Sequence, residues 1–458
     1  MRRVVGVMAL GAALLGCATV HNAPVNLPLT GSASENLRVG IEDPAYLDDV
    51  LVGLTFSGGG TRAAAFSFGV LEEMNRIPLR GASSALIERI DFISGVSGGA
   101  VTAAYYGLKK RQALADFRER FLLRNAEEDL ETTLSLGTLG RALGGGVNDQ
   151  TGFTRWLDAN LFEGATFGHF RNVRRPRIWI NASDIYNRTP FVFGSTAFSA
   201  ICSDLSAYPL SSAVAASAAV PIAFAPVVVK AYPGTCTDPL PAWILRSRDA
   251  RNKSPMLTSF AKAISGYREG AVPYIKLLDG GLVDNYGLAG FTIARESAET
   301  PYGPLTPSQA VKLRRAMFLI VDAKAGLAGN WVNTVEGPSG VELIKAAIDT
   351  TMDASLGASY TAFDRTMSEW QAAMVQWRCG LSAADRARYG APPGWNCRDL
   401  KFFIGRLGFD QLDPARAAQL EAIPTRFRLP PEQVDAAIAA GRDALRASPV
   451  LRGFIAGL

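Results

Sequence analysis

The stretch VLVGLTFSGGGTR, residues 50–62, decides the fold of this chain. Residues 50–56 are almost all apolar, which predicts a short strand that is buried on both faces. Three glycines in a row end this strand, and the pattern after them predicts a helix from about Arg62 to Met74. A buried strand that passes through a glycine turn into a helix is the first unit of an α/β fold.

The same alternation continues towards the C-terminus. Residues 90–93 form the next short apolar run, and residues 98–109 follow it with a helical pattern. Further apolar runs lie at residues 177–182, 274–278 and 317–321. Apolar strands that are separated by helices form sheets with both faces covered, so the sequence predicts a mainly parallel central sheet.

The character of the sequence changes after about residue 330. The expected elements beyond this point are helices at 341–360 and 362–376, a strand at 402–404, and a last helix that opens at Pro430-Pro431-Glu432. We therefore expect an α/β domain over residues 46–330 and a mostly helical C-terminal extension over residues 331–458. We expect this extension to pack on the α/β core.

The N-terminus is typical of an export signal. Arg2 and Arg3 precede an apolar run over residues 4–15, which is shorter than the about 20 residues that a membrane-spanning helix needs. Residues 1–16 are therefore predicted to be a signal peptide. Residues 17–45 hold Asn, Pro, Gly and Ser without a sustained period, which predicts a tether.

Leu14-Leu15-Gly16-Cys17 resembles the bacterial lipobox, in which the cysteine becomes the first residue and carries acyl chains. The resemblance implies that Cys17 anchors the protein in a bacterial cell envelope, with the outer membrane favoured because residue 18 is Ala and not Asp. The alternative is a plain signal peptide with an incidental cysteine.

Charge and cysteine content exclude some classes of function. The formal net charge is +5, and it falls to +3 without Arg2 and Arg3, which is too small to indicate a nucleic-acid partner. No CxxC pair occurs and the chain has two histidines, so we expect no metal site. An exported chain permits disulfides, and sequence neighbours suggest the pairs Cys202–Cys236 and Cys379–Cys397, with four buried thiols as the alternative.

Gly95-Val96-Ser97-Gly98-Gly99 has the form GxSxG and lies between a predicted strand and a predicted helix. In that context a sharp turn exposes the serine hydroxyl as a nucleophile, and Gly95 and Gly99 avoid collisions on either side. The alternative is a glycine-rich helix start in which Ser97 is an ordinary cap.

The glycine triplet Gly58, Gly59 and Gly60 is the second candidate element. Successive glycines let backbone N–H groups converge on one point, as an oxyanion hole requires. A phosphate-binding loop fits less well, because the Lys-Ser/Thr ending of a P-loop and the GxGxxG spacing are both missing. A third interpretation is a tight turn that allows close packing of strand and helix.

Asp279-Gly280-Gly281 follows a predicted strand, where open α/β sheets place their ligands. Asp279 is the candidate base, Asp284 is the rival acid, and a turn-capping role is the alternative. A Ser-His-Asp triad with the histidine last is excluded, because no histidine follows His169. The base for Ser97 is then His169 or a carboxylate.

These elements, in this order, resemble the patatin-like phospholipases over roughly residues 48–325. The resemblance rests on GGGxR at 58–62, GxSxG around Ser97, Asp-Gly-Gly at 279–281, and Ala216-Ser217-Ala218-Ala219-Val220-Pro221, which is similar to a further ASxAxP-type segment of the family. It implies a three-layer α/β/α sandwich and a serine acyl hydrolase of the phospholipase A or lysophospholipase type. The family works with a Ser–Asp dyad, here Ser97 and Asp279, and without a cofactor.

The expected substrates are membrane phospholipids or other acyl esters. Arg62 either supports the glycine loop or meets a lipid phosphate, and the structural role is favoured because an Arg at a helix start often serves only as a solvated cation or ion-pair partner. Two other classes of function stay open at this point. One is an esterase or peptidase of non-lipid substrates, and the other is a non-catalytic surface lipoprotein.

Overall fold

The computed structural model describes residues 20–32, 49–79, 84–131, 136–250, 253–326 and 329–458. The predicted signal peptide and Cys17 lie outside the described residues, as do residues 33–48. Among the described helices, none is both long and apolar enough to cross a bilayer.

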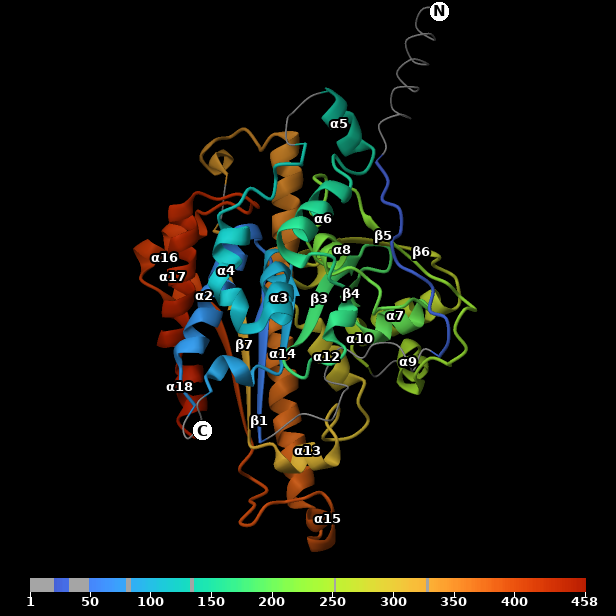
Figure 1. Cartoon of the computed structure of the whole chain (residues 1–458), viewed down its shortest axis with the longest axis vertical. Helices are drawn as coiled ribbons and strands as arrows, with labels where there is room; N and C mark the ends of the chain where they lie inside the picture. The colour runs from blue at the N-terminus through green and yellow to red at the C-terminus, as the bar shows by residue number, and fades with distance from the viewer. Residues whose placement is uncertain (1–19, 33–48, 80–83, 132–135, 251–252, 327–328) are drawn as a thin grey trace, which may run out of the picture.

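One eight-stranded sheet runs through the molecule in the order β5-β6-β3-β2-β1-β7-β8, with β4 paired to β3 (Figure 1). The strands are β1 Val50–Phe56, β2 Phe92–Val96, β3 Arg177–Asp184, β4 Thr189–Phe193, β5 Val227–Lys230, β6 Tyr274–Asp279, β7 Arg315–Asp322 and β8 Lys401–Gly408. The central strands β3, β2, β1, β7 and β8 are parallel, whereas β4 and β6 run antiparallel to β3. The predicted mainly parallel sheet is confirmed.

Helices flank this sheet, as the α/β pattern predicts. The α-helices are α2 Gly60–Arg76, α3 Gly98–Lys109, α4 Ala113–Phe117, α5 Leu136–Leu143, α6 Thr151–Leu157, α7 Ser195–Ala200, α8 Leu210–Ser217, α9 Ala242–Arg248, α10 Pro255–Arg268, α11 Gly281–Asp284, α12 Ala289–Glu296, α13 Pro307–Lys312, α14 Gly340–Cys379, α15 Ala383–Arg388, α16 Pro414–Glu421, α17 Pro431–Ala447 and α18 Pro449–Ile455. Shorter helical turns include η7 Phe167–Phe170 and η8 Asn330–Asn333.

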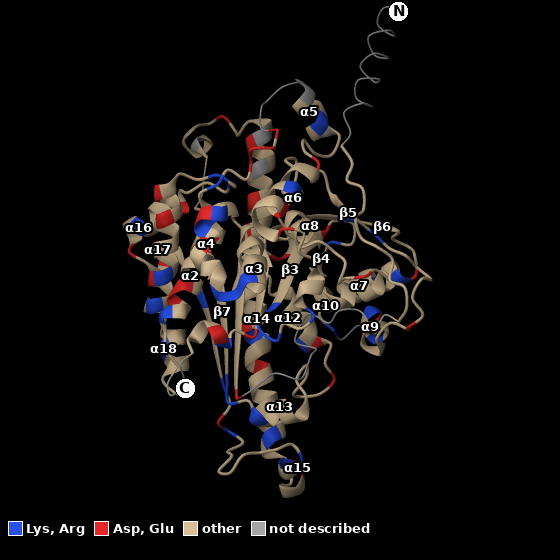
Figure 2. Cartoon of the chain, in the orientation of Figure 1, with Lys and Arg blue, Asp and Glu red and all other residues tan. Residues whose placement is uncertain are grey.

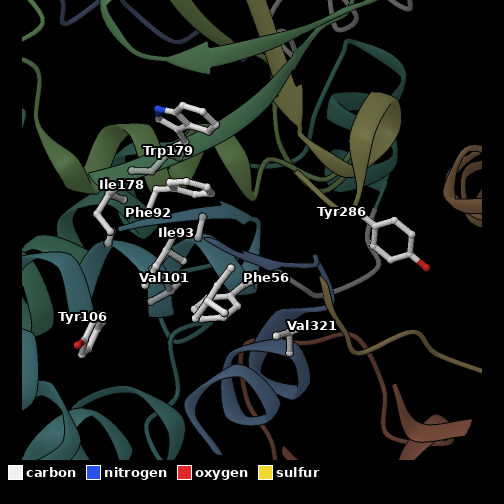
Figure 3. Packing of buried hydrophobic residues seen from close by; sticks show 14 of the residues in the cluster. Phe56, Phe92, Ile93, Val101, Tyr106, Ile178, Trp179, Tyr286 and Val321 are labelled. Carbon is white, nitrogen blue, oxygen red and sulfur yellow. The ribbon is translucent and has the colours of Figure 1, made fainter. Parts of the chain in front are cut away.

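The core is built from alternate side chains of β2 and its neighbours (Figure 3). Phe92 packs its ring against Phe291 of α12, with ring centroids 4.5 Å apart, and Trp179 of β3 stacks beside it. The next residue, Ile93, points to the other face of the sheet because side chains alternate along a strand. All strand residues of β1 and β2 are buried, so both motifs that follow these strands start from a rigid base.

The C-terminal extension is part of the same fold. β8 pairs with β7 over its whole length, and α17 packs along α2. The prediction of two helices over 341–360 and 362–376 is wrong, because α14 runs without a break from Gly340 to Cys379. Thr361, at the predicted boundary, only weakly disfavours a helix and does not end one.

The described part of the predicted tether, residues 20–32, is bound to the body and is not free. The side-chain N–H groups of Asn26 donate to Ser203 Oγ and to the Lys230 carbonyl, and the Leu29 N–H donates to the Cys202 carbonyl. Leu29 also packs against a disulfide between Cys202 and Cys236. A free tether is therefore wrong for this segment, because its polar groups find partners along β5 and its neighbours.

A second disulfide joins Cys379, at the end of α14, to Cys397. Both pairs are those that the spacing along the sequence suggests. The second bond ties the longest helix of the structure to the loop that leads into β8.

Candidate active site

Ser97 lies at the turn from β2 into α3, in a left-handed backbone conformation with φ 50° and ψ −121°. Its neighbours on both sides have no room for a side chain. A Cβ atom at Gly95 would come within 2.7 Å of the Ala100 Cα, and one at Gly99 within 2.5 Å of the Phe56 carbonyl oxygen. This is the sharp strand-to-helix elbow that presents a nucleophilic serine, although Ser97 itself is only 4% exposed.

Asp279 ends a strand, β6, that runs in the opposite direction to β2, and it lies beside the turn that carries Ser97. β2 pairs with β3 as far as the pair Val96–Asn181, and β6 pairs antiparallel with β3 from the next level, Ala182–Asp279. The ends of β2 and β6 therefore meet at adjacent levels of β3. The Ser97 hydroxyl lies close enough to the Asp279 carboxyl to stabilise its charged form and lower its pKa.

Burial of Asp279 raises the pKa of its carboxyl from 3.8 to about 6. Two hydrogen bonds to the charged form work against this rise: one from the Gly281 N–H, 2.8 Å from Oδ1, and one from Ser97. Desolvation is the larger effect. The carboxylate is thus a stronger base than an exposed aspartate and is still ionised at neutral pH.

The segment that resembles ASxAxP holds both residues in place. The Ser217 hydroxyl accepts the Ser97 N–H at 2.8 Å and donates to the Asn181 carbonyl. The Asp279 N–H donates to the Ala219 carbonyl at 2.8 Å. One short stretch of backbone and one hydroxyl therefore fix the spacing between the elbow and the acid.

The glycine triplet lies directly beside Ser97. A Cβ at Gly58 would be 3.4 Å from the Ser97 Cβ, and one at Gly98 would be 1.9 Å from the Gly60 carbonyl oxygen. Gly59 and Gly60 have φ values of 137° and 59°, which residues other than glycine rarely adopt. The sequence therefore forms a backbone turn beside Ser97 that side chains at these positions would block.

Asn285 is a site residue that the motifs did not indicate. Its side-chain oxygen accepts the Gly58 N–H at 3.1 Å, and its carbonyl oxygen lies 3.3 Å from the same nitrogen. The Gly58 N–H is thus already engaged, so of the three expected oxyanion donors only the N–H groups of Gly59 and Gly60 stay candidates. The available signal was an Asn four residues after Gly281, but its long-range partner cannot be read from spacing.

Arg62 is buried, and acceptors within the protein engage its guanidinium. It donates to the carbonyls of Ala323 and Ile423 and, at 3.1 Å, to the Thr425 hydroxyl. Burial lowers the pKa of its guanidinium to about 10, so it stays charged at neutral pH. Of the two roles expected for Arg62, this arrangement favours support of the glycine loop.

The rival bases have other partners. His169 is exposed, and its Nδ1 pairs with the Thr166 backbone N–H at 3.1 Å, which closes the cap of η7. Asp284 is buried and accepts the Ala289 N–H at 2.6 Å, at the start of α12. His21 lies in the N-terminal segment and is exposed.

No cluster of three or more His, Cys, Asp or Glu residues that could hold a metal occurs in the part of the chain that the structure describes. A cavity of about 590 Å³ is lined by Ile90, Lys110, Arg175 and others. It lies where β2 and β3 begin, at the edge of the sheet opposite Ser97, and is therefore separate from the site.

The model of the patatin-like phospholipase family matches residues 54–292, which is more than half of the chain. A comparison with curated proteins gives no match. Similar solved structures include VipD from Legionella pneumophila, 12% identical with a TM-score of 0.33, where the alignment covers 95% of this chain and 72% of VipD. Human GIVD cytosolic phospholipase A2 is 12% identical with a TM-score of 0.35, covering 89% of this chain and 63% of the human protein. ExoU from Pseudomonas aeruginosa, solved with SpcU, is 13% identical with a TM-score of 0.23 and 82% of each chain covered.

Proposed function

The chain belongs to the patatin-like phospholipase family, and from this premise we propose that it hydrolyses acyl esters of membrane phospholipids through Ser97 and Asp279. The observation that carries the proposal is the contact between a serine on a strained elbow and a buried carboxyl whose pKa is about 6. A hydroxyl and a base in hydrogen-bond contact are the minimal machinery of covalent acyl transfer.

In the proposed reaction, Asp279 takes the proton of the Ser97 hydroxyl while Oγ attacks the ester carbonyl carbon. The N–H groups of Gly59 and Gly60 stabilise the negative oxygen of the tetrahedral intermediate. The intermediate collapses, the carbon–oxygen bond to the alcohol breaks, and Asp279 returns its proton to that alcohol. Water, deprotonated by Asp279, then attacks the acyl-Ser97 ester. The bond from the acyl carbon to Ser97 Oγ breaks, Asp279 returns the proton to Oγ, and the fatty acid is released.

The test is covalent labelling by a fluorophosphonate together with fatty-acid release from phospholipid vesicles. We expect Ser97→Ala to abolish labelling and to lower turnover by about 10³-fold or more, and Asp279→Asn to lower both strongly. His169→Ala is the matched control and keeps full activity. Equal labelling of the parent and of Ser97→Ala would disprove the nucleophile.

A panel of substrates separates the remaining classes. Phospholipids, triacylglycerols, short soluble esters and peptides are compared on the same enzyme. A lipid hydrolase prefers the first two, whereas a small-molecule esterase or a peptidase is most active on the last two. An inert surface lipoprotein cleaves none of them and does not react with the fluorophosphonate.

We propose in addition that Cys17 carries the acyl chains of a bacterial outer-membrane lipoprotein. Support comes from the apolar run that ends Leu-Leu-Gly-Cys after two arginines. Two or more acyl chains bind a membrane firmly, whereas one holds it only marginally. Growth with an alkyne fatty acid should label the protein, and Cys17→Ser should remove the label.

A further inference from the structure

Large apolar side chains gather in one exposed segment between β7 and the first turns of α14. Their exposed fractions run from 37% for Trp331 to 102% for Val335, and the set is Trp331, Val332, Val335, Leu343 and Ile344. The other exposed large apolar residues of the described chain are spread over the N-terminal segment, the β3–β4 turn, α9 and the start of β6. A local concentration of this kind marks an interaction surface, whereas scattered residues need no explanation.

This segment is connected to the active site through α14. Met352 of α14 contacts the turn that follows Asp279, because a Cβ at Gly281 would lie 2.4 Å from the Met352 terminal methyl carbon. Leu343 lies nine residues closer to the start of α14, which places it about 13 Å further along the helix axis. Figure 1 shows this end of α14 and the loop before it at the same end of the molecule as α5.

The N-terminal segment also begins at this end of the molecule (Figure 1). The Asn22 side-chain amide donates to the carbonyls of Ala225 and Pro226, and its oxygen accepts the Gln150 N–H, so the segment is fixed from residue 22 onward. Cys17 lies three positions before Val20, a span of at most about 11 Å of extended chain. An acyl anchor at Cys17 would therefore leave the body from the same end.

The charges around the apolar residues favour insertion over electrostatic attraction. Glu336, Glu342 and Asp349 outnumber Lys345 in this stretch of sequence, and Asp353 pairs with Lys324 at 3.1 Å. Figure 2 marks Asp and Glu positions in red along this half of α14. Anionic headgroups are not attracted to such a surface, so its partner is an apolar medium.

We propose that Trp331, Val332, Val335, Leu343 and Ile344 form a membrane-docking surface that enters the bilayer interface and brings the Ser97 edge of the sheet against the lipid. The role of this surface in catalysis rests on the proposed function, whereas its binding to a bilayer does not. A lipid hydrolase must meet its substrate at a bilayer, and this apolar surface lies further along α14 from Met352, which contacts the turn after Asp279.

The test compares Val335→Glu/Leu343→Glu with Leu245→Glu, in full-length chains that carry Cys17→Ser so that no acyl anchor contributes. Leu245 is a matched control because it is also an exposed helical leucine, 46% against 57% for Leu343, but lies in α9. Binding is measured by flotation with phosphatidylcholine vesicles at low and high salt. We expect the double variant to bind at least about tenfold less, and Leu245→Glu to bind like the parent at both salt concentrations.

Equal binding of the double variant and the parent would overturn the proposal, and so would binding that disappears at high salt. Turnover of a short soluble ester controls for folding and should be unchanged in all three chains. If the proposed function is wrong, this ester is not cleaved by any of them, while the difference in vesicle binding remains. Quenching of tryptophan fluorescence by brominated lipid, lost in Trp331→Phe, gives a second measurement that does not depend on the double variant.

Discussion

The Asp279 carboxyl determines the pH range in which the proposed reaction can run. The base must be ionised to accept the Ser97 proton, and its pKa is raised by burial to about 6. We therefore expect kcat/KM on a soluble ester to be flat above pH 6 and to fall about tenfold per pH unit below it. A profile that stays flat down to pH 4 would contradict Asp279 as the base.

The same burial destabilises the fold at neutral pH. The folded pKa of about 6 lies above the ordinary 3.8, so the folded state binds this proton more tightly, and stability is lost as the pH rises from 3.8 to 6. We expect Asp279→Asn to raise the free energy of unfolding at pH 8 by up to about 3 kcal/mol while activity is lost. The gain should vanish near pH 4 in urea unfolding, and a loss of stability at pH 8 would refute the argument.

A substitution of Arg62 distinguishes structural support of the glycine loop from contact with a lipid phosphate. Arg62→Met removes three hydrogen bonds and leaves buried carbonyls without a donor, so we expect the free energy of unfolding to fall by about 3 kcal/mol or more. Activity on a phospholipid and on a neutral short ester should change by the same factor. A loss confined to the phospholipid would instead assign Arg62 to the phosphate group.

At the scale of residues, the sequence indicates candidate catalytic residues because their chemistry requires particular residues next to them in the chain. Ser97 and Asp279 stand in short motifs whose glycines are required by backbone crowding, and the lack of a late histidine leaves few bases. Asn285 and the link from Ser217 to Asn181 depend on contacts between distant segments. No local spacing encodes such contacts.

At the scale of elements, two glycines let α2 and α17 touch backbone to backbone. A Cβ at Gly441 would lie 2.1 Å from the Phe66 carbonyl oxygen, and one at Gly69 would lie 2.0 Å from the Ile438 carbonyl oxygen. We expect Gly441→Ala to destabilise the fold by about 1–3 kcal/mol through overpacking, although alanine favours helices. The measurement is the midpoint of urea unfolding.

Gly357 in α14 is the matched control, because nothing lies within 4 Å of a Cβ at that position. Gly357→Ala should stabilise the protein by up to about 1 kcal/mol through helix propensity alone. If both substitutions shift stability in the same direction, the close approach of α2 and α17 does not limit the packing.

Whether a segment forms a strand or a helix was predictable where the apolar periodicity was strong. The direction of each strand within the sheet was not. The strand at 274–278 was expected from its apolar run, but its antiparallel placement beside β3 follows from the chain path after α10. The expected gap at residue 361 is also absent. Thr361 only weakly disfavours a helix, and α14 continues past it to Cys379.

At the scale of the whole molecule, we expect the predicted α/β domain, residues 46–330, to need the C-terminal extension for folding. Ending the chain at residue 330 would remove β8 from the edge of β7, α17 from α2, and the Ile423 and Thr425 acceptors of Arg62. An open apolar edge strand promotes aggregation. We expect this shortened chain to be insoluble or rapidly cleaved by trypsin, and a soluble product with cooperative unfolding would contradict this.

The bond between Arg62 and Ile423 has a consequence for biosynthesis. These residues are 361 positions apart, so Arg62 lacks its Ile423 acceptor until residue 423 has been synthesised. At about 5–20 residues per second, the ribosome needs roughly 20–70 s between the two. The brace under the glycine loop is therefore completed late, only after residue 423 has been added to the nascent chain.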